Sequence, residues 1–331
     1  MFINLNLQMF AAYTGNATTS PGMSVEMKTF YDKSLLRSAK PRLVHGQFGQ
    51  KRPIPRRGGK KIEFRKPDSL PKALTPLTEG VTPAGQKIAF TKIEAEVQQY
   101  GDFVMLSDQL TLTAIDPIIA ETTMMIGDQA GLTIDTVHRE ILNAGTNVFY
   151  APKKAPDGAT TPVTSRMELD KTCLLDLHTI KKATTFLKLQ NAMPFSDGYF
   201  VGIINPAAEF DLSEDKNWQE WVKYTTPEKM YRGEIGRTSN VRWVSTTEAK
   251  VFASNVISTL IMGQNAYGIV DIEGGGMETI VKPLGSAGSA DPLNQRSTIG
   301  WKCMTPAKIL NEAYLVRIES KSTEFDDIAA N

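Results

Sequence analysis

Residues 116–145 read DPIIAETTMMIGDQAGLTIDTVHREILNAG, and this stretch predicts one long helix. Asp116 is a favoured N-cap residue, Pro117 suits the first helical position, and Gly145 suits the left-handed residue that follows a helix. Residues of one face recur every three or four positions, as a buried helix face requires: Ile119, Thr123, Ile126, Ala130, Ile134, Val137, Ile141 and Ala144. Asp128, Asp135 and Arg139 lie off this face. At 1.5 Å per residue the helix would be about 40 Å long, which indicates a structural spine.

The composition is that of a folded protein large enough for about two domains. The chain has 331 residues, of which 41% are hydrophobic and 22% are charged. Its net charge of +1 gives no overall attraction to nucleic acid or to acidic lipids. Cys173 and Cys303 are too few and too far apart for a disulfide framework or a zinc site. No signal peptide or membrane-spanning run is evident, which predicts a soluble protein with no membrane partner.

The first hundred residues have no periodicity that could build a core of their own. Residues 1–50 are irregular, and we expect either a disordered segment or an arm that gains order by lying on another surface. Residues 61–66 and 87–104 predict two strands, and the Pro-, Thr- and Gly-rich residues 67–83 predict an open connection between them. A two-stranded hairpin is marginal by itself. It therefore needs a further surface, its own or that of a neighbour.

Beyond the long helix, strands and helices alternate, which indicates a layered α/β domain. Residues 199–204, YFVGII, are continuously apolar and predict a buried strand. Asn205 and Pro206 then predict an N-cap and a first helical position. The other expected strands are residues 148–151, 241–245, 260–272, 279–284, 299–304 and 313–320, and the expected helices are residues 172–189, 207–212 and 216–224.

Between residues 51 and 66 eight cations accompany a single acid, Glu63: Lys51, Arg52, Arg56, Arg57, Lys60, Lys61, Arg65 and Lys66. One interpretation is a nucleic-acid contact that neutralises several phosphates. Against it, no set of aromatic stacking residues is interleaved with these cations, and Pro53 and Pro55 prevent a single helical face. The favoured interpretation is an arm whose cations meet carboxylates of a neighbouring subunit and so set register and specificity.

No catalytic constellation is evident, and no cofactor or metal is predicted. His45, His138 and His178 each lack a second ligand at metal-binding spacing. Gly274 to Gly276 lead into a strand and predict a turn, because a phosphate cradle would lead into a helix. Trp218 and Trp221 share a helix face, which favours core anchors over a ligand box. A small-molecule enzyme built on residues 199–272 would need a pocket of perturbed titratable groups, and none can be named.

The order of arm, hairpin, long helix, α/β domain and returning strands resembles the Hong Kong 97-type major capsid proteins of tailed phages. Several strings resemble the capsid family typified by the podovirus N-four, over about residues 100–320: Tyr100-Gly101-Asp102 with Ser107-Asp108, residues 142–147 (LNAGTN), residues 233–236 (GEIG), residues 241–244 (VRWV), residues 281–285 (VKPLG) and residues 291–302 (DPLNQRSTIGWK). Asp291 and Arg296, in the last string, are further candidates for contacts between subunits.

The resemblance implies an α+β fold of the Hong Kong 97 type with five segments. They are an N-terminal arm (1–50), an extended β-hairpin loop (51–99), a P-domain (100–164) with its spine helix at 116–144, an A-domain (165–272), and a return to the P-domain (273–331). The implied function is that of a major capsid protein, not an enzyme, which self-assembles into the pentamers and hexamers of an icosahedral head around double-stranded DNA. Scaffold, portal and decoration proteins are implied partners, the virion is the implied location after assembly in the host cytoplasm, and no motif for covalent cross-linking is evident.

Overall fold

The computed structural model describes residues 35, 43–54, 61–67, 70–77, 79–82, 85–113, 118–155, 159–215, 218–219, 237–272, 276–286, 288, 291–305, 307–325 and 328–331. The chain forms two compact units. Unit 1 holds the described residues of Met1–Lys40, Gly101–Ala130 and Met277–Cys303, and unit 2 holds those of Pro41–Tyr100, Gly131–Gly276 and Met304–Asn331.

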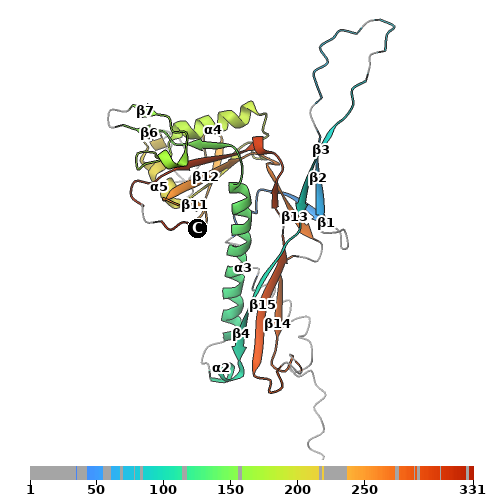
Figure 1. The fold of residues 1–331 in the computed structure, drawn as a ribbon, viewed down its shortest axis with the longest axis vertical. Helices are drawn as coiled ribbons and strands as arrows, with labels where there is room; N and C mark the ends of the chain where they lie inside the picture. Colours follow the sequence, from blue (N-terminus) through green and yellow to red (C-terminus); the bar gives the residue numbers. More distant parts are fainter. Residues whose placement is uncertain are drawn as a thin grey trace, which may run out of the picture. The chain divides into compact units, whose positions relative to one another are not determined.

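The predicted spine is confirmed as α3, Ile118–Asn143, the long helix in the middle of Figure 1. Asp116 and Pro117 lie outside the described residues. The helix ends as expected, with the backbone N–H of Gly145 donating to the carbonyl of Leu142. The left-handed conformation predicted for Gly145 is wrong, because its φ is not positive. Glycine is favoured there by a close approach instead, since a Cβ would lie 3.2 Å from the side chain of Leu315.

Unit 1 is built on a three-stranded sheet in the order β14-β15-β4. Its strands are β14 (Glu278–Lys282), β15 (Arg296–Met304) and β4, which begins in unit 2 (Gln99–Ser107), and β4 continues into the short helix α2 (Asp108–Thr113). Within this unit Gln129 of α3 joins the helix to the sheet. Its side chain donates to Asp102 Oδ2 at 2.6 Å and accepts from Trp301 Nε1 at 3.3 Å.

Unit 2 is centred on a seven-stranded mixed sheet in the order β5-β17-β12-β8-β10-β9, with β11 beside β12. The bounds of these strands are β5 (Val148–Tyr150), β8 (Phe200–Ile204), β9 (Arg237–Thr238), β10 (Val241–Ser245), β11 (Val251–Phe252), β12 (Val256–Met262) and β17 (Leu315–Ser320). The predicted strand at 199–204 is confirmed as β8, all of it buried. The final strand β17 lies inside this sheet, antiparallel to β12 and parallel to β5.

Two helices cover one face of this sheet, and their side chains share a core with Phe200 and Ile261. They are α4 (Leu177–Leu189) and α5 (Pro206–Glu214). The predicted cap of α5 is confirmed, since the Asn205 side chain accepts the N–H of Ala207 at 3.0 Å. Helix α4 starts later than the predicted residue 172, because Asp176 caps it by accepting the N–H of Thr179 at 2.8 Å. Of the helix predicted at 216–224, most residues lie outside the described part, and Trp218 is buried in the same core.

A second, three-stranded sheet of unit 2 has the order β1-β13-β16. Its members are β1 (Gln50–Ile54), β13 (Tyr267–Ile272) and β16 (Ala307–Ile309), and short pieces elsewhere in the unit are β6 (Lys153–Lys154), β7 (Thr160–Thr161), η3 (Arg166–Glu168) and η6 (Glu312–Tyr314). The prediction of one extended region at 260–272 is wrong in its pairing. A turn with Asn265 at φ 60° separates β12 from β13 and sends them to different sheets.

The predicted hairpin is present as β2 (Lys61–Pro67) and β3 (Phe90–Glu96), which pair antiparallel from Lys61 opposite Glu96 to Pro67 opposite Phe90. The second predicted strand at 87–104 is wrong as a single element. It breaks at Val97 and Gln98, after which the chain enters β4 and a different sheet.

Replacing Gly202 by alanine should destabilise the seven-stranded sheet. A Cβ there would lie 2.5 Å from the Trp243 ring, and overpacking of this kind costs about 1–3 kcal/mol. Chemical unfolding measures the change in the free energy of unfolding. Gly85→Ala is the matched control, because nothing lies within 4 Å of its added Cβ. Equal stabilities for the two variants would contradict the packing described here.

Candidate functional site

One face of the β2–β3 hairpin carries charges of both signs, which pair mainly along the diagonals between the strands. Lys61 pairs with Glu94 at 3.6 Å, and Glu63 lies 3.5 Å from Lys92 and 3.7 Å from Arg65. Along the sequence these cations have a single acid, Glu63, near them. The pairing of β2 with β3 brings a second acid, Glu94, next to Lys61. All these side chains are largely exposed, so each pair contributes little stability. The pairs do reduce the positive charge that this part of the run can offer to a nucleic acid.

The opposite face of the hairpin base is held by the same chain. Phe64 and Ala95 are buried with Val270 of β13. Gly268 allows this contact, because a Cβ on that residue would lie 2.8 Å from the Phe64 ring. The base of the hairpin therefore packs against β13 of the same unit.

The connection between β2 and β3 exposes apolar side chains, unlike the base of the hairpin. Its large apolar side chains, with Phe90 at the start of β3, are all more than half exposed: Leu70, Leu74, Leu77, Val81, Ile88 and Phe90. Single exposed apolar residues are common, but a run of them on one extended segment marks an interaction surface. The described residues of this connection thus offer apolar area that their own subunit does not cover.

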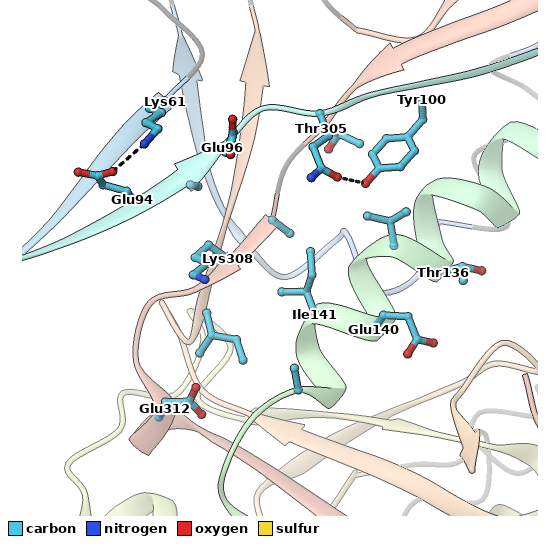
Figure 2. Close-up of a pocket in the computed structure, with 16 residues that line it drawn as sticks. Lys61, Glu94, Glu96, Tyr100, Thr136, Glu140, Ile141, Thr305, Lys308 and Glu312 are labelled. Atoms are coloured by element: carbon cyan, nitrogen blue, oxygen red, sulfur yellow. Dashed lines mark hydrogen bonds and ion pairs between the residues drawn. The ribbon is translucent and has the colours of Figure 1, made fainter. Parts of the chain in front are cut away.

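A groove of about 860 Å³ runs between the hairpin base and the C-terminal half of α3 (Figure 2). Its charged lining comes from several elements of unit 2: Lys61, Glu94, Glu96, Glu140, Lys308 and Glu312. The Tyr100 hydroxyl donates to Gln98 Oε1 at 2.6 Å beside it. Although burial raises the pKa of Glu140, hydrogen bonds from Lys250 and Arg139 outweigh it and hold that pKa below its ordinary value. The Glu140 carboxylate is therefore ionised at neutral pH and is not a poised general acid.

A buried carboxylate fixes the chain just before β1. Asp135 of α3 is fully buried and accepts the backbone N–H groups of Val44 and His45, both at 2.7 Å. Its other oxygen lies 2.7 Å from His45 Nδ1. The hydroxyl of Tyr267 donates to the His45 carbonyl, and burial raises the pKa of that phenol, so it stays protonated. We call these residues the Asp135 lock.

Asp135 and Arg139 lie off the apolar stripe of α3, yet both are buried. Arg139 donates from Nη1 to the Glu248 carbonyl at 3.0 Å and pairs with Glu140 at 3.0 Å. The spacing rule missed their burial because the groups that bury them, Val44 and His45 for Asp135 and the Glu248 carbonyl for Arg139, lie about a hundred residues away in the chain. No local signal in the sequence identifies these partners.

His138, one turn beyond Asp135, is buried against the same segment. Its Nε2 lies 3.2 Å from Thr305 Oγ1, while its Nδ1 has no partner among the described residues. Burial lowers its pKa from 6.5 to about 4; Asp135 opposes this shift, and His45 adds to it. His138 is therefore a neutral packed side chain at pH 7.

The predicted contact residues fall into three groups. Lys51 and Arg52 lie on β1, and Lys61, Arg65 and Lys66 lie on β2, all exposed or nearly so. In unit 1 the Arg296 backbone N–H donates to Asp291 Oδ2 at 2.8 Å, and the Arg296 Nε lies 3.9 Å from the same oxygen. Arg56, Arg57 and Lys60 lie outside the described residues. Whether these ten residues contact other subunits stays a prediction.

Within the described ranges, three or more His, Cys, Asp or Glu side chains nowhere gather as metal ligands would. In the same part of the chain, no helix has the length and apolar character needed to cross a membrane.

Removing the lock carboxylate should release the segment that precedes β1. Asp135→Ala leaves two buried N–H groups and the His45 ring without their acceptor, at a cost of about 3–5 kcal/mol. Hydrogen exchange should report faster exchange at the amides of Val44 and His45. Glu121→Ala, an exposed acid in the first turn of the same helix, should cost less than about 1 kcal/mol. Unchanged exchange in Asp135→Ala would contradict the lock.

Acid should destabilise the protein through His138. Because its pKa in the folded chain is about 4, below the ordinary 6.5, its stabilising contribution is complete above pH 6.5 and is lost as the pH falls from there towards 4. The loss amounts to about 3 kcal/mol. His138→Gln should flatten this pH dependence in chemical unfolding, whereas His178→Gln, exposed on α4, should not. Parallel pH profiles for wild type and His138→Gln would rule the effect out.

Comparison with known proteins gives consistent results. Residues 91–318 match the family model described as phage capsid protein. The sequence matches no curated protein. The fold is similar to the capsid protein of Ralstonia phage GP4, with TM-score 0.62, 13% identity, and 96% of this chain and 98% of that chain covered. It is also similar to the capsid of cyanophage P-SCSP1u, with TM-score 0.64, 11% identity and coverages of 85% and 88%. A third neighbour is the cyanophage Pam1 capsid, with TM-score 0.62, 11% identity and coverages of 87% and 92%.

At such low identities the solved structures establish the fold, and the family model establishes the membership. The α+β architecture expected from the sequence, with its hairpin, spine helix and layered sheet, is confirmed by both. The chain belongs to the phage capsid protein family, has the Hong Kong 97-type fold and functions as a major capsid protein.

Proposed function

We propose that copies of this chain assemble into the pentamers and hexamers of an icosahedral phage head that encloses double-stranded DNA. The observation that carries the proposal is the exposed apolar connection of the hairpin. Fully burying one such side chain contributes about 1.5–3 kcal/mol, and the described residues of one subunit leave six of them in solvent. A neighbouring copy that covers this segment would supply the missing surface.

Weak contacts suffice for a shell because each copy makes many of them. Once two contacts of a subunit are formed, the next is intramolecular and gains from a high effective concentration. Heterologous contacts that close on themselves give rings and then a closed particle. We assign residues 1–50 to the arm, 51–99 to the loop that crosses a neighbour, 100–164 and 273–331 to the P-domain, and 165–272 to the A-domain.

We also propose that the ten predicted contact residues lie at the boundaries between subunits, where their charges set the register of one subunit against the next. Their role is specificity, because exposed ion pairs contribute little affinity. We further propose that the protein is not an enzyme, that it assembles in the host cytoplasm, and that a separate scaffold protein guides it. Portal and decoration proteins are further proposed partners.

The alternative is a nucleic-acid-binding protein that uses residues 51–66. The described part of that run disfavours it, because Lys61 and Arg65 already have carboxylates of the hairpin within 4 Å. A sequence-independent DNA contact would depend steeply on salt.

Replacing apolar residues of the connection should block shell formation without unfolding the subunit. In Leu74→Ser/Leu77→Ser/Val81→Ser the exposed side chains are made polar, so the fold should keep its stability while closed particles disappear at wild-type concentration. Size exclusion and negative-stain microscopy measure this. Lys72→Ser/Thr75→Ser/Thr82→Ser changes polar residues of the same connection and should still assemble. A normal yield of particles from the apolar triple variant would overturn the proposal.

A further inference from the structure

A second cavity of unit 2, of about 360 Å³, lies where β1 and the hairpin base meet the turn between β12 and β13. Three cations line it, Arg52, Arg65 and Lys66, together with side-chain amides that include Asn265 and Asn311. No carboxylate belongs to this lining within the described residues. We call it the cationic pocket.

The cations of the pocket are only partly compensated by their own chain. Arg52 is positioned by a hydrogen bond of 3.3 Å from Nη1 to the Glu63 carbonyl and by the Phe64 ring at 5.7 Å, neither of which is a carboxylate. Arg65 reaches Glu63 at 3.7 Å, an acid that also serves Lys92. Lys66 has no ion-pair partner in the part of the chain that the structure describes. Three positive charges beside one shared acid favour an anionic occupant.

The chain itself carries a matching segment. With 37 Lys and Arg against 36 Asp and Glu, a local excess of one charge must be matched by a local excess of the other. The densest acidic run is Glu324-Phe325-Asp326-Asp327, the only four consecutive residues with three carboxylates. The Phe325 side chain is 47% exposed. This tetrapeptide therefore combines negative charge with a half-exposed aromatic ring.

Asp326 and Asp327 lie outside the described residues, and the described neighbours of this segment are anchored on elements that do not line the cationic pocket. Thr323 donates from its backbone N–H and its hydroxyl to Asp211 Oδ1 at 3.3 and 2.7 Å, and the Phe325 ring packs edge-on against Phe210 at 5.7 Å. Beyond the segment, the Asn331 N–H donates to the Val251 carbonyl at 3.2 Å. These anchors are on α5 and β11, which contribute nothing to the lining of the pocket. These anchors favour a site for the segment on another molecule.

We propose that the acidic segment 324–327 of one copy docks into the cationic pocket of a second copy. The proposal rests on the self-assembly proposed above and names one of its contacts. The phosphates of a nucleic acid would satisfy the cations equally, but the pocket also contains the apolar side chains of Phe64, Leu310 and Tyr314. A phosphate backbone has no partner for them, whereas Phe325 does.

Charge reversal on both sides tests the pairing. Arg52→Glu/Lys66→Glu in the pocket, or Glu324→Lys/Asp327→Lys in the segment, should each raise the protein concentration needed for particles by at least about tenfold, because like charges then face each other. The quadruple variant should recover most of the wild-type yield. Particle yield is read by sedimentation and negative-stain microscopy, and thermal unfolding checks that each variant folds.

A matched control places the same charge change elsewhere. Lys181→Glu/Lys188→Glu reverses two exposed lysines of α4, and reversing the acidic segment should not rescue any defect it causes. A quadruple variant no better than either double variant would overturn the docking proposal, while the loss of particles in the apolar triple variant would still support self-assembly. Loss of binding to a labelled duplex DNA in the pocket variant, with normal assembly of the segment variant, would assign the pocket to nucleic acid and overturn it too.

Discussion

The buried carboxylate of Asp135 is the interaction on which the arrangement of unit 2 depends. It lies on the spine helix and accepts three hydrogen bonds from two consecutive residues, Val44 and His45. Charge-assisted hydrogen bonds in a dry environment are strong, and their loss leaves several buried groups unpaired at once. Through them α3 fixes the chain five residues before β1 begins. Strand β1 then pairs in parallel with β13, against which the hairpin base packs.

This sequence of contacts divides unit 2 into a rigid body and an extension. Sheet strands with two covered faces supply the stability, with one core against α4 and α5 and a second that includes Leu142 of the spine. The hairpin takes part in neither of these cores and has only a small one at its base, formed by Phe64, Ala95 and Val270. A hairpin with so small a core projects its apolar connection without being held along its length. Under the proposed assembly, stability and shell contacts are thus served by different residues, so we expect that the connection can change without unfolding the subunit.

Local signals in the sequence predicted those parts of the fold that depend on local physics. The apolar run at 199–204 became β8, and Asn205 became the cap of α5, because burial and capping act within a few residues. Contacts between residues far apart in the chain could not be predicted from the sequence. Nothing in residues 87–104 shows that β3 and β4 belong to different sheets, and nothing around Asp135 shows that its partners lie 90 residues earlier. The sequence shows the basic run at residues 51–66. That Glu94 neutralises Lys61, however, follows only from the register in which β2 pairs with β3.

The weakness of the charge pairs on the hairpin is consistent with a subunit that must assemble without error. The exposed pairs at 3.5–3.7 Å within the hairpin are screened by salt and contribute little, so their charges would remain available to a neighbouring copy in the proposed assembly. Apolar contact supplies affinity but little orientation, because it is non-directional. Under the proposed assembly the charges of β2 would supply the orientation, since Lys61, Glu63 and Arg65 alternate in sign along one face and a shift by two residues would place like charges together. The proposed assembly needs both properties on one extension, and residues 61–96 combine them: an exposed apolar connection between two strands that carry charges of both signs.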